Sequence, residues 1–222
     1  MALETRALAD FMPLLLPNAP DAPWPVAEQC LRLAAAEFCE RTRCWRQVTR
    51  RRITRATSCL VAPEYATIHE IENASIDGMD LTPTQFSDID WQASESEQAG
   101  QPKYITQTSA DTITLMPFAE GELFISVFLK PRVGLDGVIP SDYDEDTEDR
   151  ANVVPDFLFV KHAETIAFGA LNRLLNIPGQ PYTNPARAAE YALMFERAVN
   201  THFASNLRGQ HRAAARVRPD HF

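Results

Sequence analysis

The chain has 222 residues, a net charge of −9 and 45% hydrophobic residues, which is enough apolar sequence for an ordinary buried core. Its apolar runs are too short to cross a bilayer and its first residues lack a basic stretch, so we expect a soluble protein with no membrane span and no signal peptide. The four cysteines form no CxxC pair, which favours buried, reduced thiols of a cytosolic product over a disulfide or zinc framework: Cys30, Cys39, Cys44 and Cys59.

Charge is strongly segregated along the chain. Seven arginines and no acidic residue lie between positions 41 and 55, whereas 56–102 holds nine acidic residues and neither lysine nor arginine. Such blocks predict contacts with partners rather than a particular fold. The Arg-rich segment comprises Arg41, Arg43, Arg46, Arg50, Arg51, Arg52 and Arg55.

The N-terminal part predicts two helices joined by an extended segment. Residues 3–12 have the spacing of a short amphipathic helix, and five prolines between positions 13 and 25 predict an extended strap. From Val26 to Trp45 apolar residues recur near one helical face. This pattern predicts the first long helix.

The middle of the chain predicts a sheet. It is rich in Thr, Ile, Val and Phe, and residues 122–132 alternate so that one face is fully apolar and the other largely so. Thr82 and Pro83 suit the start of a short helical turn between strands. Residues 136–150 predict a solvated acidic loop. The expected strands are 47–61, 65–76, 103–108, 111–116 and 122–132.

Residues 154–179 are the most strongly patterned segment. Their apolar face spans about 200° of a helical wheel, which predicts a central helix with neighbours on at least two sides. Pro155 and Asp156 suit its first turn, and Pro178 lies after its end. His162 falls on the polar stripe, so we interpret it as a surface histidine.

A last helix is predicted at 185–208. Asn184 suits its N-cap, Pro185 its first position and Gly209 its end, and residues 209–222 predict a flexible arm. The expected fold class is therefore α+β. A discontinuous helical bundle would comprise 1–45 and 155–208, and 46–154 would form a β-rich insertion with the acidic loop.

Catalytic and cofactor motifs are absent from the sequence. Neither a phosphate-binding glycine loop, GxSxG nor HExxH occurs, and the histidines are scattered, so we expect no enzyme and no cofactor. Asp142, Asp144 and Asp146 have the spacing of a calcium loop. However, Thr147 replaces the required glycine and Val153 the bidentate glutamate, which favours a solvated charge run.

The Arg-rich segment allows two interpretations. Its guanidinium groups could neutralise DNA phosphates, or they could meet acidic residues of a neighbouring protein. If 47–61 is a strand, alternate arginines point to opposite faces, which argues against one DNA-reading surface. We favour an inter-subunit interface and keep a nucleic-acid-binding module using 41–55 as the alternative.

Several short motifs resemble one known family in their order and spacing. They are Ala35-x-x-Phe38-Cys39-x-x-Thr42-x-x-Trp45, Gly100-Gln-Pro-Lys-Tyr104, Ile113-Thr-Leu-Met-Pro117, and Pro155-Asp156-x-Leu158 leading to Gly169-Ala170. Together with the proline strap they resemble the head-to-tail adaptors of tailed phages, also called tail tubular protein A in short-tailed phages. The long acidic segment 136–149 departs from the family pattern.

This resemblance implies a structural virion protein made in the host cytoplasm. It implies a ring of twelve copies that docks on the portal ring, binds tail nozzle or tube proteins and continues the DNA channel without sequence-specific DNA binding. The C-terminal arm would dock on the portal through Arg208, His211, Arg212, Arg216, Arg218 and Phe222. We hypothesise that part of 64–97 or 136–149 faces the lumen and repels DNA. The lumen-facing set is Asp142, Asp144, Glu145, Asp146, Glu148 and Asp149.

Overall fold

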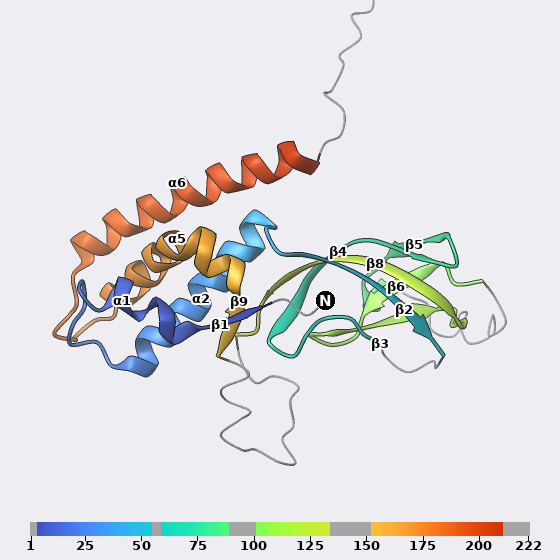
Figure 1. Ribbon diagram of the computed structural model, residues 1–222, viewed down its shortest axis with the longest axis horizontal. Coiled ribbons are helices and arrows are strands. Elements are labelled where there is room, and N and C mark those ends of the chain that lie inside the picture. The colour runs from blue at the N-terminus through green and yellow to red at the C-terminus, as the bar shows by residue number, and fades with distance from the viewer. Residues whose placement is uncertain (1–3, 55–58, 89–100, 134–151, 211–222) are drawn as a thin grey trace, which may run out of the picture.

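The protein separates helices from strands in space. The structure, a computed structural model, describes residues 4–54, 59–88, 101–133 and 152–210. Helices gather at one end of the molecule, together with one short pair of strands, and the seven-stranded sheet lies at the other end, which confirms the predicted α+β class (Figure 1). We call these ends the helical half and the β half. The helical half contains α1 (Met12–Leu15), α2 (Trp24–Thr42), α5 (Asp156–Leu175) and α6 (Pro185–Gln210).

Helix α5 lies at the centre of the helical half. It contacts α2, α6 and α1, so its apolar face meets neighbours on more than one side, as predicted. Gly169 permits the closest approach. A Cβ atom at this position would lie 2.8 Å from the Phe195 ring on α6 and 3.0 Å from Ala34 on α2. The absence of a side chain therefore lets three helices meet at one point.

The N-terminal residues differ from the predicted helix. Thr5–Ala7 form β1, which pairs antiparallel with β9 (Val153–Pro155) just before α5. A 3-10 turn (Leu8–Phe11) and α1 follow, and residues 16–22 form hydrogen-bonded turns, so the predicted extended strap is wrong. Pro13 does not prevent α1 because it occupies the first turn, where its missing N–H needs no partner.

Helix α6 begins where the sequence predicts. The Asn184 side chain accepts a hydrogen bond from the Arg187 N–H at 3.1 Å, which is N-cap geometry. The expected end at Gly209 is wrong, because α6 continues to Gln210. A single glycine costs a helix only about 1 kcal/mol, so it does not by itself stop one.

The β half is a seven-stranded sheet in the order β2-β8-β4-β5-β6-β7-β3. The long strand β8 pairs antiparallel with β2 and β4, and its Leu123, Ile125 and Val127 side chains are fully buried. The strands are β2 (Arg46–Ile53), β3 (Cys59–Leu60), β4 (Ala66–Ile76), β5 (Met79–Pro83), β6 (Tyr104–Gln107), β7 (Thr112–Met116) and β8 (Gly121–Pro131).

The predicted helical turn at Thr82 and Pro83 is wrong. Asp77 and Gly78 both have positive φ, and they connect β4 to β5 in a tight hairpin. This hairpin keeps the chain extended, so that Pro83 pairs in parallel with Ile105 of β6. A short 3-10 turn (Phe86–Asp88) comes only after the strand.

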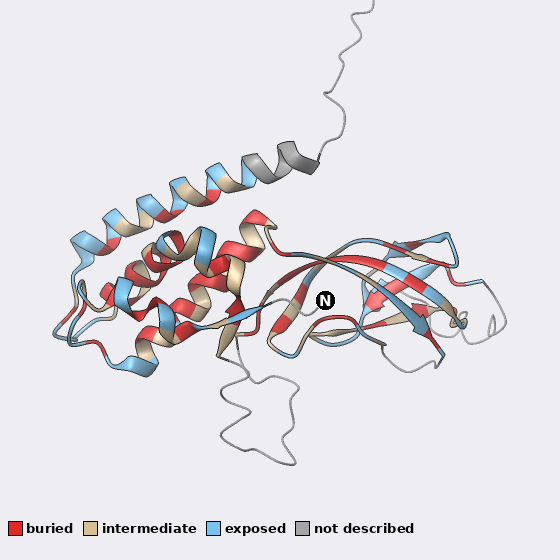
Figure 2. Ribbon diagram, in the orientation of Figure 1, coloured by how far each residue is buried: buried red, intermediate tan, exposed pale blue. Residues whose placement is uncertain are grey.

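The expected strand 47–61 is two separate strands at opposite edges of the sheet. These edges approach each other, because the Arg51 guanidinium on β2 donates to the Leu60 carbonyl on β3. Gln47 Nε2 donates to the Val61 carbonyl at 3.1 Å. The sheet is therefore curled, and many apolar residues of its strands are buried (Figure 2).

The two halves meet at the end of α2. Arg43 takes a left-handed conformation with φ 51°, which turns the chain from α2 toward β2. Trp45 is buried and stacks on Tyr65 with ring centroids 6.0 Å apart. An ion pair between Lys130 of β8 and Glu40 of α2 adds a contact between the halves.

Candidate interaction surfaces

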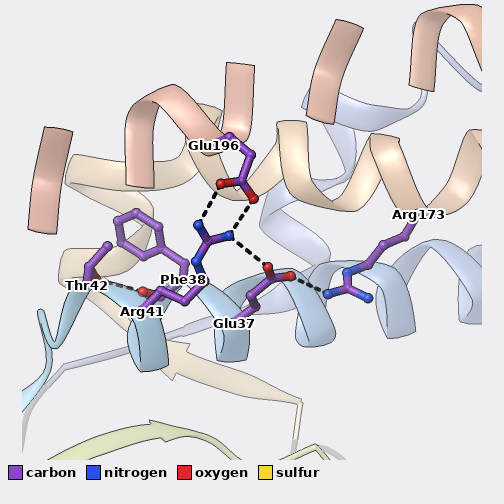
Figure 3. Close-up of polar contacts among 6 residues, drawn as sticks. All are labelled: Glu37, Phe38, Arg41, Thr42, Arg173 and Glu196. Atoms are coloured by element: carbon purple, nitrogen blue, oxygen red, sulfur yellow. Dashed lines mark hydrogen bonds and ion pairs between the residues drawn. The ribbon is translucent and has the colours of Figure 1, made fainter. Parts of the chain in front are cut away.

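The first predicted interface arginine, Arg41, joins helices within the chain. Its guanidinium donates two hydrogen bonds of 2.6 Å to Glu196 on α6 and one of 3.1 Å to Glu37 on α2 (Figure 3). Glu37 also pairs with Arg173 on α5. The hydrogen bond from Arg41 holds the pKa of Glu196 below its ordinary value. We call these four residues the Arg41 clip, and it ties α2, α5 and α6 together.

Arg43 and Arg46 are also engaged within the chain. Arg43 forms an ion pair of 2.7 Å with Glu70, and Arg46 pairs with Glu72. Both guanidinium groups lie over the Phe128 ring, at 5.6 and 5.4 Å from its centre. They thereby cover an aromatic ring on the outer face of the sheet.

The remaining described arginines of β2 lie on two faces. The register places Arg50 opposite Phe124 and Arg52 opposite Glu122, on the outer face, whereas Arg51 lies on the other side and reaches β3. Arg50 is 4.0 Å from Glu122. Within the described ranges no ion pair is found for Arg52. Together with exposed Val48 and half-exposed Phe124, Arg50 and Arg52 form what we call the β2 outer strip.

The seven arginines therefore do not form one surface. Their assignment to an inter-subunit interface stays a prediction, with the β2 outer strip as the part that is free to meet a partner. Arg55 lies outside the described residues. The same holds for the lumen-facing set and for the arm from His211 onward. Arg208 lies near the end of α6.

Large apolar side chains are exposed on two helices of the helical half. Leu193 on α6 is 73% exposed. Trp24, at the start of α2, is 48% exposed. One helical turn beyond each lies a charged residue, Arg197 after Leu193 and Glu28 after Trp24. Neither charge has an ion-pair partner among residues that the structure describes.

The interpretation of His162 as a surface histidine is wrong. Its ring lies 4.8 Å from that of Phe38 on α2 and 4.6 Å from that of His202 on α6. Its Nδ1 atom is buried without a hydrogen-bond partner. Burial, followed by the nearby His202, lowers the pKa of His162 to about 4. Part of the polar stripe of α5, at His162 and the buried Thr165, thus lies at a helix contact, whereas Lys161 and Asn176 of the same stripe are exposed.

The described parts of the chain assemble no recognisable catalytic or metal site. A groove of about 690 Å³ opens beside β4, but its titratable residues are only His69 and Glu70, and Glu70 is paired with Arg43. No cluster of three His, Cys, Asp or Glu side chains that could hold a metal occurs in these ranges. None of the helices described is both long and apolar enough to cross a membrane.

Comparison with curated proteins found no match. Residues 5–220, however, match the SU10 adaptor protein family, and the chain therefore belongs to this family. This confirms the phage adaptor class suggested by the sequence motifs, and it supports a structural protein of the virion.

Sequence reasoning missed three of the features described above. The β1–β9 pairing joins residues about 150 positions apart, and nothing in the local pattern of Thr5–Ala7 signals it. The Arg41 clip was missed because nothing in the sequence distinguishes Arg41, which pairs within the chain, from the other arginines of the same segment. The His162–His202 contact had one available signal, since each histidine occurs on a helix that was predicted to pack against others.

Proposed function

We propose that this chain is a head-to-tail adaptor that assembles as a ring of twelve copies on the portal. The ring would join the capsid to the tail and continue the DNA channel, without catalysing a reaction and without a cofactor. The observation that carries the proposal is the family match over 5–220, almost the whole chain. The resemblance to tail tubular protein A motifs supports the position at the head-tail junction.

Two complementary faces support self-association as a ring. Leu193 and Arg197 offer one face, on α6, and Trp24 and Glu28 offer another, at the start of α2. The faces offer apolar area and opposite charges to each other. A contact between two different faces is head-to-tail, and it closes into a ring when the rotation permits.

Two further contacts complete the proposed mechanism. The arm residues from Arg208 to Phe222 dock on the portal, and many arms on one ring offset weak individual contacts by multivalency. Acidic residues of 136–149 face the lumen, so DNA passes without sticking. Charge reversal of Asp144, Glu145 and Asp146 then slows genome ejection, measured as DNA release from purified virions. Unchanged release kinetics would remove the lumen assignment.

The alternative, a nucleic-acid-binding module, rests on Arg50 and Arg52 of the β2 outer strip. It is weakened by the ion pairs of Arg41, Arg43 and Arg46 with glutamates of the same chain. Duplex binding whose affinity falls with salt, by about 0.9 per phosphate on log–log axes, would favour this module. No duplex binding at moderate salt dismisses it.

The adaptor proposal is tested by sedimentation with assembled cognate portal rings. The full chain should co-sediment with the rings, and a version ending at Leu207 should lose this association. A full-length variant with Arg212, Arg216 and Arg218 changed to Ala separates the charge of the arm from its length. Absence of co-sedimentation for the full chain would overturn the proposal.

Mixing of two variants tests the ring contact itself. Leu193→Asp damages one face and Trp24→Asp the other, so each variant alone should fail to form rings. A mixture should form heterodimers, because each partner supplies one intact face. Val160→Asp, which alters a residue 67% exposed on α5, is the matched control and should assemble normally. Rings formed by either single variant would exclude these faces.

A further inference from the structure

Two cysteine side chains meet where α2 gives way to β2. Helix α2 ends at Thr42, and the left-handed Arg43 then donates its backbone N–H to the Cys39 carbonyl at 2.9 Å. This cap folds the chain back, so that the residue after it lies against the last helical turn. That residue is Cys44, and its sulfur lies 3.9 Å from the sulfur of Cys39.

The two sulfur atoms are near enough for a bond to form between them after a small movement. A disulfide bond is about 2.05 Å long, so the two sulfur atoms need to approach by about 2 Å. Cys39 is fully buried, whereas Cys44 is half-buried. Cys30 and Cys59, also within the described ranges, make no hydrogen-bond contact with another sulfur.

The two thiols differ in reactivity. The hydrogen bond with Cys39 lowers the pKa of Cys44. Burial raises the pKa of Cys39 well above its usual range. The thiolate is the nucleophile in disulfide exchange, so the more exposed Cys44 reacts first and Cys39 second.

We propose that Cys39 and Cys44 are a modification site that reacts with small-molecule disulfides and closes into an intramolecular disulfide. The Cys44 thiolate attacks one sulfur of the reagent, forms a mixed disulfide and releases one small thiol. Cys39 then loses its proton to solvent and attacks the Cys44 sulfur, which releases the second small thiol. The two cysteines are oxidised and the reagent is reduced to two thiols.

The bond would act on the junction between the two halves. Residues 39–44 contain the turn that carries the chain from α2 into β2, and this turn depends on the left-handed Arg43. A disulfide across the turn holds Arg43 in that conformation whenever the neighbouring contacts open. The oxidised protein therefore keeps its helical half and its β half in a more fixed relation than the reduced protein does.

The first experiment oxidises the reduced full-length chain with oxidised glutathione. We expect an intact mass lower by about 2 Da, the loss of two hydrogens on disulfide formation. Trypsin cuts after Arg41 and Arg43, between the two cysteines, so a fragment pair held together until reduction identifies the bond. A stable glutathione adduct on Cys44 in the wild type, or first reaction at Cys59, would overturn the proposal.

Single substitutions separate the two roles. Cys39→Ser should stop at a glutathione adduct on Cys44, and Cys44→Ser should prevent the fast reaction. Cys30→Ser and Cys59→Ser are matched controls and should close the bond at the wild-type rate. Equal rates in all four variants would contradict a specific pair.

The second measurement tests the effect on the junction. Amide hydrogen exchange of residues 43–46 should slow several-fold in the oxidised protein and return on reduction, because opening of the turn is restricted. The same peptides of Cys44→Ser should not respond to the reagent. Unchanged exchange after verified bond formation would leave the chemistry intact and refute the proposed restraint.

Discussion

The two ends of α6 are held by different forces. Its N-terminal half packs by apolar contact, with Ala188 and Phe195 buried and the Phe195 ring against Gly169 of α5. Its C-terminal half adds to the buried Val199 the ion pair of Glu196 with Arg41 and the ring contacts of His202. Apolar packing is insensitive to pH and salt, whereas these polar contacts respond to both. We call residues 186–195 the permanent end of α6, because its apolar packing does not depend on pH or salt. We call residues 196–204 the conditional end, because its polar contacts do, and this end precedes the arm.

Phe195→Ala is expected to lower the free energy of unfolding more than the other substitutions proposed for α6, because it removes the main apolar contact of the permanent end. Loss of this buried ring leaves a cavity beside Gly169, and we expect the free energy of unfolding to fall by about 3 kcal/mol. Chemical denaturation measures the change. Phe203→Ala, which truncates a partly exposed phenylalanine of the same helix, is the control and should cost far less. Similar losses for both variants would contradict the distinction.

Acidification should weaken the conditional end. His162 has a pKa of about 4 in the folded protein and an ordinary value of 6.5 when unfolded. Between these two pH values the unfolded state binds more protons than the folded state. The free energy of unfolding is therefore highest above pH 6.5, falls as the pH drops toward 4 and changes little below pH 4. For a half-buried ring we expect a loss of about 1–2 kcal/mol.

The pH effect is measured as unfolding free energy across pH 4–7. The variant His162→Phe keeps a ring beside Phe38 and cannot titrate, so the difference between wild type and variant isolates the histidine. An identical pH dependence in the two proteins would assign the loss to other groups.

Removal of the Arg41 clip should have a smaller effect. Arg41 and Glu196 are each at least one-third exposed, so solvent screens their interaction, and we expect Arg41→Met to cost about 1 kcal/mol or less. The more sensitive measurement is hydrogen exchange along 196–204, which should accelerate while 186–195 stays unchanged. A double-mutant cycle with Glu196→Gln gives the coupling. Uniform acceleration along α6 would show that the helix opens as one unit.

Salt concentration should change hydrogen exchange at the conditional end of α6 through its effect on the Arg41 clip. Raising ionic strength from 0.05 to about 0.5 M shortens the screening length several-fold, so exchange along 196–204 should increase slightly in the wild type. The Arg41→Met variant should show no such response. A salt response that survives in the variant would point to charges outside the Arg41 clip.

The sequence predicts those elements whose pattern is decided locally. The Asn184 cap, the alternation along 122–132 and the width of the apolar face of 154–179 each depend on neighbouring residues, and all three agree with the structure. The failures occur where distant partners decide. Thr5–Ala7 pair with a strand near position 154, and Thr82 is extended because the hairpin at Asp77 carries the strand onward.

The candidate surfaces follow the same division. The segregation of charge could be predicted from the sequence, because it requires only a count of residues. The ion-pair partners of individual arginines could not be predicted, because they depend on the fold. Arg43, Arg46 and Arg41 pair with glutamates that are 26 to 155 positions away in the sequence. Arg41 has one nearer partner, a glutamate one helical turn before it on α2. Spacing alone cannot separate an arginine committed to its own chain from one that is free to meet a partner.

The β1–β9 pairing also bears on the order in which the protein folds. It joins Arg6 to Val154, and α2 likewise finds its main helical neighbours in α5 and α6, so the helical half is built from the first and last parts of the chain. During synthesis the strands between them leave the ribosome before α5 exists. The β half can therefore fold while the chain is still on the ribosome. Helix α2, by contrast, cannot pack against α5 until residues more than 110 positions later have been made. The part of its apolar face that α5 and α6 cover stays open for that interval, which makes the helical half the part most exposed to misassembly while the chain is being made.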